Sequence, residues 1–248
     1  MIKTERDPLV QVRLQTVAII PAYQDEQHIG DIVYRTRKQL NHVVVIDDGS
    51  TDRTAERARE AGAEVIVHGQ NRGKGEAIKT GLAHVLAASN APRSGENGLD
   101  RQVRWISLLD SDGQHLPEEI DRFLKVAASA TRPTFLIGNR MNNLAGMPFI
   151  RRVVNRFMSR QISRVCKQDI PDTQCGFRML DHLLVPQLLG GGDRFDYDTE
   201  VLIIASREGY SVESVPITTV YTDQVSKIRP LRDAIRFFKL MWRYRKPF

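Results

Sequence analysis

The sequence is poor in cysteine and contains no long apolar run. Its two cysteines, Cys166 and Cys175, cannot build a disulfide framework, and without a further pair or spaced histidines they do not make a zinc site. No stretch reaches the roughly 18 uncharged residues that span a bilayer, and the first 14 residues are polar and charged. We therefore expect no transmembrane helix and no signal peptide, and we predict a cytoplasmic chain that is soluble or peripherally membrane-associated.

Acidic residues are nearly absent from the C-terminal segment, residues 227–248. This segment holds eight basic residues and one acid, Asp233, which gives a net charge of +7, while the whole chain carries +6. The body before the segment therefore has a net charge of −1 (+6 minus +7). A nearly neutral body argues against a nucleic-acid-binding protein, and the basic segment indicates one local anionic partner.

Short apolar runs alternate with longer segments of helical period. The runs typical of strands are Val17–Ile20, Val43–Ile46, Val65–Val67, Trp105–Leu109, Phe135–Ile137 and Val212–Tyr221. The helical segments between them are Gln27–Leu40, Thr54–Ala61, Glu76–Ala88 and Pro117–Ala130. This alternation predicts an α/β fold with a single doubly wound, mostly parallel sheet. With no internal repeat or linker, we expect one domain over residues 1–248, with its core over residues 15–222.

Ligands of such a sheet bind beyond the carboxyl ends of its strands, so the residues that follow each strand are the candidate site. Pro21–Glu26 follow the first strand, and Asp47–Asp52 follow the second. A helix cap would explain the last three residues of the second run. It does not explain Asp47 and Asp48, which come directly off a buried strand. Two adjacent acids at this edge favour hydrogen bonds to a nucleotide base and ribose.

A glycine-rich turn, Asn71–Gly75, precedes the third helical segment. Two glycines allow the backbone to approach a ligand closely, and a lysine at a helix N-terminus, here Lys74, favours phosphate. The spacing is not that of a Walker loop. An ordinary glycine turn is an equally good interpretation of this segment alone.

The most informative motif is Asp110–His115, at the end of a strongly apolar strand. Residues at i and i+2 of an extended chain face the same way, so Asp110 and Asp112 should converge. Their mutual repulsion would be relieved by a divalent cation, and hard oxygen ligands suit Mg²⁺ or Mn²⁺. Gln114 can add a carbonyl oxygen. The alternative is a polar turn ahead of the helix that begins at Pro117.

Basic residues follow the fifth strand. Arg140 lies at its end, and then Arg152, Arg156, Arg160 and Arg164 recur every four residues along a helix. These arginines either form a solvated basic face or hold an anionic acceptor.

Two later segments are dense in polar residues, Asp172–Arg178 and Phe195–Glu200. Arg178 could reach a phosphate. Glu200 could face a sugar or the metal, although a helix cap by Asp198 is the simpler interpretation of that segment.

The C-terminal segment has the period of a basic amphipathic helix. One narrow stripe at 100° per residue contains Arg232, Arg236, Lys239, Arg243 and Lys246. Either the helix packs on the core with this edge outward, or it lies on an anionic membrane surface with Trp242 and Tyr244 at headgroup level. Lys227, ahead of the helix, could contact a lipid phosphate.

In this order the motifs resemble glycosyltransferase family 2, whose fold is called GT-A. They are most similar to dolichyl- and polyprenyl-phosphate hexosyltransferases, which include mannose and glucose transferases. The resemblance covers Val17 to Phe238. Its carriers are Pro21–Glu26, Asp47–Asp52, Asn71–Gly75, Asp110–His115, Gly138–Arg140, Asp172–Arg178 and Ser226–Lys227.

The resemblance implies a donor site, a metal site and an acceptor site. The nucleotide-sugar site would comprise Pro21, Tyr23, Glu26, Asp48, Lys74 and Asp110. The metal, Mg²⁺ or Mn²⁺, would be held by Asp110, Asp112 and Gln114. The acceptor phosphate would meet Arg152, Ser159 and Lys227, together with Arg140 and Arg178. The candidate catalytic residues are Asp112, Arg140, Arg178 and Glu200.

The expected activity is inverting, metal-dependent transfer of a hexose from GDP- or UDP-hexose to polyprenyl or dolichyl phosphate at the cytosolic membrane face. A phosphate monoester has a second pKa of about 6, so it is already an anionic nucleophile at neutral pH and needs no strong general base.

Three alternatives differ in their sequence signals. Sugar-1-phosphate nucleotidyltransferases open with a glycine-rich loop after the first strand, and none is present here. Transferases acting on a hydroxyl of a polysaccharide or protein commonly carry Gln-x-x-Arg-Trp, which is also absent. A catalytically silent, membrane-docked nucleotide-sugar binder would not need Asp110, Asp112 and Arg178 intact.

Overall fold

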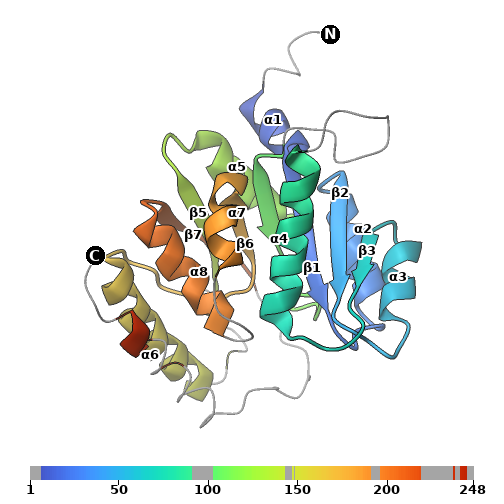
Figure 1. The fold of residues 1–248 in the computed structure, drawn as a ribbon. Helices are drawn as coiled ribbons and strands as arrows, with labels where there is room; N and C mark the ends of the chain where they lie inside the picture. Colours follow the sequence, from blue (N-terminus) through green and yellow to red (C-terminus); the bar gives the residue numbers. More distant parts are fainter. Residues whose placement is uncertain are drawn as a thin grey trace.

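The structure is a computed structural model that describes residues 7–90, 103–142, 147, 149–190, 196–218, 237 and 241–244. In this part of the chain, seven strands form one sheet. They are β1 (Thr16–Ala22), β2 (His42–Asp47), β3 (Glu64–Val67), β4 (Trp105–Leu108), β5 (Thr134–Asn139), β6 (Arg178–Asp181) and β7 (Ser211–Pro216). Their order in the sheet is β3-β2-β1-β4-β6-β5-β7 (Figure 1). All neighbours are parallel except β6, which runs antiparallel to β4 and β5. The predicted α/β fold with a single mostly parallel sheet is confirmed.

Helices cover both faces of the sheet. The described α-helices are α1 (Pro8–Leu14), α2 (Ile29–Arg37), α3 (Thr54–Glu60), α4 (Lys74–Asn90), α5 (Ile120–Ser129), α6 (Phe149–Cys166), α7 (Val185–Leu189) and α8 (Asp196–Arg207). Two short 3₁₀ helices, η2 (Pro117–Glu119) and η3 (His182–Leu184), precede α5 and α7. Helices α4, α7 and α8 contact one another on one face, while α2 and α5 lie on the other (Figure 1).

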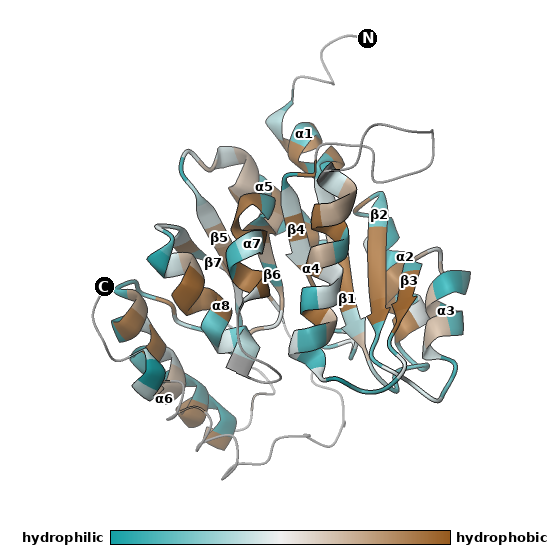
Figure 2. Cartoon of the chain, viewed as in Figure 1, coloured by the Kyte–Doolittle hydropathy of each residue, from teal (hydrophilic) through white to brown (hydrophobic). Residues whose placement is uncertain are grey.

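The core lies between the sheet and these helices. All residues of β1 and all but the first of β2 are buried, as expected for strands covered on both faces. Their apolar residues appear as the brown ribbons of Figure 2. Helix α5 contributes a stripe at helical spacing, made of Ile120, Phe123, Leu124 and Ala127.

Strand β6 was not predicted, and it is the element that completes the site. It has only four residues and begins with the charged Arg178, so it lacks the apolar run of its neighbours. Arg178 pairs with Leu108, the last residue of β4. Because β6 enters from the carboxyl edge of β4, the preceding segment, Asp172–Phe177, lies at the same edge as the ends of the parallel strands.

The described part of the C-terminal segment packs on the body of the protein. Phe237 is buried, and Met241 and Tyr244 lie against the core, whereas Trp242 is 77% exposed. Of the two interpretations of this segment, these residues favour packing on the core. Lys227 lies outside the described residues. In the part of the chain that the structure describes, no helix combines the length and hydropathy needed to cross a membrane.

Candidate active site

The carboxyl edge of the sheet brings a lysine between two aspartates. Lys74 is the first residue of α4, and its Nζ lies 2.7 Å from Asp110 Oδ1 and 3.1 Å from Asp198 Oδ2. Burial alone would lower the pKa of Lys74 and raise the pKa of Asp110. Their attraction outweighs burial, so the pKa of Lys74 rises and the pKa of Asp110 falls to about 2. Both side chains are therefore charged at neutral pH.

Asp112 adds a second carboxylate beside Asp110. Its Oδ1 accepts a hydrogen bond from the backbone N–H of Gln114 at 3.0 Å. Burial raises the pKa of Asp112, and the negative charge of Asp110 raises it further. The negative charge of Asp110 thus opposes ionisation of Asp112, and a cation between the two carboxylates would relieve that repulsion.

The donor set at this edge fits a hard divalent cation. Within the described ranges, no cluster of three or more histidine, cysteine, aspartate or glutamate side chains is placed to hold a metal by itself. One or two carboxylates are, however, the usual protein contribution to a Mg²⁺ site, because substrate phosphates and water supply the other ligands. Asp110 and Asp112, with Gln114 on the same turn, match that contribution.

Gly176 provides the space that the Asp110 carboxylate occupies. A Cβ built on Gly176 would overlap all three heavy atoms of that carboxyl group. The polar segment before β6 therefore leaves room, at Gly176, for the carboxyl group of Asp110 from the motif Asp110–His115. The glycine of Asp172–Arg178 has a steric reason that the sequence alone did not reveal.

His115 is buried against the acid pair. Its Nε2 lies 3.8 Å from Asp110 Oδ2, and its ring lies 5.7 Å from the Phe177 ring. Burial lowers the pKa of His115 to about 4, more than the attraction of Asp110 raises it, so the ring is neutral at pH 7. The burial of His115 beside Asp110 was not predicted.

Asp48 fixes the glycine-rich turn. Its carboxylate accepts hydrogen bonds from the backbone N–H groups of Arg72 at 2.9 Å and Gly73 at 2.7 Å. The same carboxylate lies 2.7 Å from His68 Nδ1 and is almost completely buried. We expected Asp48 to contact a nucleotide directly. In the structure it holds the turn that presents Lys74.

The other predicted nucleotide contacts lie around the end of β1. Pro21 is buried in the strand, and Tyr23, two residues later, is 41% exposed. Glu26 is exposed, and its Oε2 accepts a hydrogen bond from the backbone N–H of Arg53 at 3.0 Å. Tyr23 and Glu26 are therefore both accessible at the surface beyond the end of β1.

Asp25 connects the first motif to the acid pair, a role that was not predicted. Its Oδ2 accepts a hydrogen bond from the Ser111 hydroxyl at 2.6 Å, and its Oδ1 lies 2.9 Å from His28 Nδ1. Ser111 lies between Asp110 and Asp112, so Asp25 anchors their turn. The sequence signal that could have indicated this role is the position of Asp25 just beyond the end of a strand.

Arg140 and Asp172 form a buried bidentate pair. Arg140 Nε and Nη2 donate to the two carboxylate oxygens at 2.7 and 2.9 Å, and the backbone N–H of Arg140 adds a third bond. Burial would raise the pKa of Asp172, but the hydrogen bonds and charge of Arg140 outweigh it and lower that pKa. Asn155 of α6 also donates to Asp172, and Ser159 donates to Asn155. The predicted acceptor residue Ser159 is therefore buried in this network.

Helix α6 also carries Arg152, another residue predicted at the acceptor site. Its Nε is buried and has no hydrogen-bond partner among the residues that the structure describes. A buried guanidinium N–H without a partner is costly, so a ligand anion would satisfy it.

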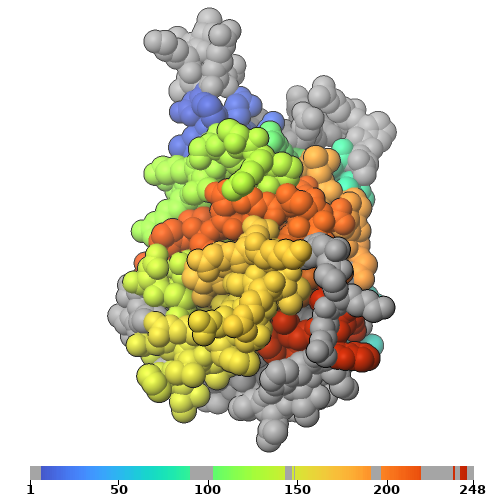
Figure 3. Space-filling view, turned by 90° about the vertical axis from the view of Figure 1, so that its left-hand side faces the viewer, coloured from blue at the N-terminus to red at the C-terminus, as the bar shows by residue number. Residues whose placement is uncertain are grey.

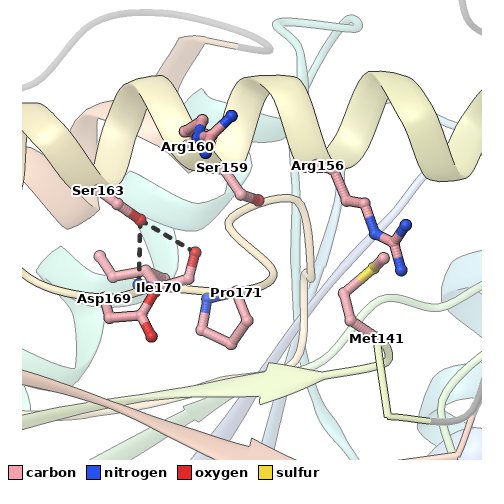
Figure 4. A pocket seen from close by; sticks show the side chains of 8 residues that line it. All are labelled: Met141, Arg156, Ser159, Arg160, Ser163, Asp169, Ile170 and Pro171. Atoms are coloured by element: carbon pink, nitrogen blue, oxygen red, sulfur yellow. Dashed lines mark hydrogen bonds between the residues drawn. The ribbon is translucent and has the colours of Figure 1, made fainter.

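A pocket of about 310 Å³ lies between α6 and the segment that precedes Asp172 (Figure 4). Two exposed arginines, Arg156 and Arg160, line it on the helix side. The rest of the lining comes from Met141, Ser159, Ser163, Asp169, Ile170 and Pro171. The pocket is thus a basic hollow on the same helix as Arg152.

Arg178 is almost completely buried, and its guanidinium binds backbone carbonyls. Nε donates to Cys175 O at 2.9 Å, and Nη1 donates to Asp198 O at 2.6 Å. Its Nη1 also lies 3.5 Å from Asp198 Oδ1. We expected Arg178 to reach a phosphate. The structure shows it positioning Asp198, the second acidic partner of Lys74, which we had interpreted as a helix cap.

Glu200 binds the C-terminal segment. The Tyr244 hydroxyl donates to its Oε1 at 2.7 Å, and Arg243 Nη1 donates to the same oxygen at 3.2 Å. Glu200 is buried, and burial together with this hydrogen bond raises the pKa of Tyr244 to about 12. Glu200 thus contacts the chain's own C-terminal residues, and its contact with a sugar or the metal stays a prediction.

Comparisons with known proteins show the family and the fold of this chain. The family model described as Glycosyl transferase family 2 matches residues 17–188. The UDP-N-acetylglucosamine--dolichyl-phosphate N-acetylglucosaminyltransferase of Methanococcus voltae is 28% identical over 230 residues, which cover 83% of this chain and 85% of the relative. The dolichyl-phosphate beta-glucosyltransferase of Saccharomyces cerevisiae is 28% identical over 256 residues, with 89% and 71% covered.

Among solved structures, glucosyl-3-phosphoglycerate synthase from Mycobacterium tuberculosis, in complex with Mn²⁺, uridine diphosphate and phosphoglyceric acid, superposes with a TM-score of 0.68. The alignment covers 97% of this chain and 83% of the synthase, at 15% sequence identity. At this identity the likeness concerns the fold, and it confirms the expected GT-A architecture.

Proposed function

The chain belongs to glycosyl transferase family 2, and we propose that this glycosyltransferase moves a hexose from a nucleoside diphosphate sugar to a polyprenyl or dolichyl phosphate. The reaction would invert the anomeric configuration, require Mg²⁺ or Mn²⁺, and take place at the cytosolic face of a membrane. We further propose that residues 1–248 act as one domain. The names of the archaeal and yeast relatives support the choice of a lipid-phosphate acceptor.

The observation that carries the proposal is the charge arrangement around Asp110. One lysine, Lys74, lies between Asp110 and Asp198, and Asp112 remains as a repelled second carboxylate. A donor diphosphate brings negative charge that Lys74 can bind at the N-terminus of α4, where the helix dipole adds to the attraction. A bound divalent cation would supply charge neutralisation for the diphosphate as it leaves.

The acceptor side is supported by the arginines beyond β5. Arg140 is held rigidly by Asp172, and the Nε of Arg152 has no partner within the described chain. Cationic groups in fixed positions can hold a phosphate monoester without an entropic cost at the moment of reaction. The phosphate oxygen would attack the anomeric carbon opposite the leaving diphosphate, while Lys74 stabilises the charge that develops there. Tyr23 and Glu26 are proposed to contact the nucleotide, and Lys227 the acceptor.

A transfer assay tests the proposal. UDP- and GDP-hexoses are offered with Mn²⁺ and a short-chain polyprenyl phosphate in detergent, and the glycolipid is quantified. Asp112→Asn should lower turnover about 100-fold or more, because transition-state charge loses several kcal/mol of stabilisation. Its melting temperature should stay at or above that of the wild type, since a repelled charge is removed.

The matched control is Asp31→Asn, which removes a largely exposed acid on α2. It should leave turnover within about twofold of the wild type, because a surface ion pair contributes little. Near-normal turnover of Asp112→Asn would refute the metal assignment. Wild-type transfer to hydroxyl acceptors but to no lipid phosphate would refute the acceptor assignment.

A further inference from the structure

The first half of α6 exposes an apolar stripe. Half of the exposed large hydrophobic side chains among the described residues lie on this helix. They are Phe149, Ile150, Val153, Val154 and Phe157, which are between 48% and 77% exposed. Figure 3 shows that α6 lies across the surface of the molecule, and Figure 2 shows brown segments along it. Grouped exposed apolar residues of this kind mark an interaction surface.

The polar and apolar faces of this helix are placed opposite to those of an ordinary surface helix, because its polar face is buried and its apolar face is exposed. Its buried face contains Asn155 and Ser159, which belong to the polar network of Asp172. At 100° per residue the apolar stripe spans about 140° on the side opposite Asn155. A helix that only served the core would turn its apolar residues inward. Among the described residues nothing covers the outward stripe, which leaves it available to a partner.

The charge of α6 shows what kind of partner fits. The helix contains five arginines and no acidic residue. They are Arg151, Arg152, Arg156, Arg160 and Arg164. Exposed arginines continue from the apolar stripe toward the C-terminal end of the helix, and Arg156 and Arg160 line the adjoining pocket. An apolar face beside a row of guanidinium groups is complementary to a lipid surface that carries phosphates.

We propose that α6 is the membrane-docking element of this protein and that it lies in the interface of an anionic lipid surface. The stripe enters the boundary between headgroups and acyl chains, and the arginines bind lipid phosphates. A second copy of the chain fits this face poorly, because it would bring three exposed arginines, Arg156, Arg160 and Arg164, against three others. Residues 241–244 lie beside α6 (Figures 1 and 3), and Trp242 adds an exposed indole there.

This surface differs from the one that the sequence suggested. The basic C-terminal segment was a candidate interfacial helix, but its described residues Phe237, Met241 and Tyr244 pack on the core. The proposal concerns where the enzyme docks rather than what it transfers. It therefore does not depend on the identity of donor or acceptor.

Vesicle co-sedimentation without donor or acceptor tests the proposal. The full chain is mixed with vesicles of phosphatidylcholine, with or without 30% phosphatidylglycerol (about one lipid in three, a typical anionic fraction). The wild type should bind the anionic vesicles more tightly. The double variant Ile150→Ser, Phe157→Ser should lose at least about tenfold in partition coefficient, because two inserted side chains are removed. Arg164→Gln should lose about fivefold on anionic vesicles and little on neutral ones.

The matched control is Tyr34→Ser, Leu183→Ser, which removes two exposed apolar side chains outside α6. It should bind vesicles as the wild type does, and all variants should keep the wild-type melting temperature because every changed residue is exposed. Equal binding by the α6 variant and the wild type would overturn the proposal. So would a wild-type dimer, measured by light scattering, that the α6 variant converts to a monomer with unchanged vesicle binding.

Discussion

Replacing Gly176 by alanine tests the steric relation between the segment before β6 and the acid pair. The added methyl group would overlap the carboxyl group of Asp110, which is held in place by Lys74 at 2.7 Å. Gly176 does not have a positive φ, so alanine adopts its backbone conformation without strain. The methyl group and the carboxylate cannot both keep their positions, and the carboxylate must move away from Lys74.

The size of the effect follows from these contacts. Overpacking of a tight interior costs about 1–3 kcal/mol, and a hydrogen bond to a charged group contributes about 1.5–3 kcal/mol. Because displacement of the carboxylate relieves the overlap, the two costs do not add fully, and we expect a loss of about 2 kcal/mol. For a chain of this length, that lowers the melting temperature by about 4–8 °C. Transfer activity should fall by about 100-fold, since the displaced acid no longer faces the donor site.

A double-mutant cycle isolates this contact. In an Asp110→Ala background the overlap is absent, so Gly176→Ala should cost almost nothing in urea unfolding, which gives a coupling energy of about 2 kcal/mol. Gly30→Ala in α2 is the matched control, because its Cβ would meet the nearest atom, Arg57 O, at an ordinary 3.8 Å. The control should be neutral or slightly stabilising. An equal cost of Gly176→Ala in both backgrounds would refute the reasoning.

Three further predictions concern the residues that hold the site. Asp48→Asn should destabilise the chain by about 2 kcal/mol in urea unfolding and raise KM for the donor. The reason is that an amide cannot accept both backbone N–H bonds of the glycine-rich turn. An unchanged KM would contradict this role of Asp48. Asp172→Asn should cost about 3 kcal/mol at pH 7, because the ion pair between Arg140 and the buried Asp172 is lost. Because folding lowers the pKa of Asp172, the ion pair contributes its full stability above the pKa of the unfolded state and loses it as the pH falls through the pKa of the folded state. The stability difference between Asp172→Asn and the wild type should therefore shrink below about pH 4. A stability difference that does not change with pH would disprove this role of Asp172. Tyr244→Phe should lower the free energy of unfolding by about 1.5 kcal/mol, since Glu200 loses the hydrogen bond from the Tyr244 hydroxyl. An unchanged free energy in calorimetry would show that the C-terminal contact is not formed in solution.

The parallel part of the sheet could be predicted because its strands are short, apolar and followed by charged residues. Val43–Ile46 and Phe135–Ile137 lie within β2 and β5. The acids that we expected at strand ends lie at or just beyond those ends. Periodicity carries this information because burial on both faces demands uninterrupted apolar runs. For five of the six predicted strands the boundaries agree within two residues, and hydrogen bonding at the sheet edges decides such differences. The sixth was predicted as Val212–Tyr221, but β7 ends at Pro216.

The partners of the charged residues could not be predicted, because they depend on contacts across long sequence separations. Asp48 bonds a turn 24 residues later, and Glu200 bonds a tyrosine 44 residues later. A sequence pattern shows that an acid follows a strand, but not whether its oxygens are already occupied. Arg178 shows the same limit, since a buried arginine at the start of a strand satisfies backbone carbonyls that only the tertiary fold assembles.

The antiparallel strand β6 lies in the middle of the sheet, between two strands made much earlier in the sequence. A nascent chain that ends before residue 178 has β4 and β5 but nothing to join them, so both expose an unpaired edge at the centre of the future sheet. The β3-β2-β1-β4 part of the sheet and the part that contains β5 are therefore joined only late in folding. Premature termination in this region leaves unpaired edges on β4 and β5, and aggregation of truncated chains should begin there.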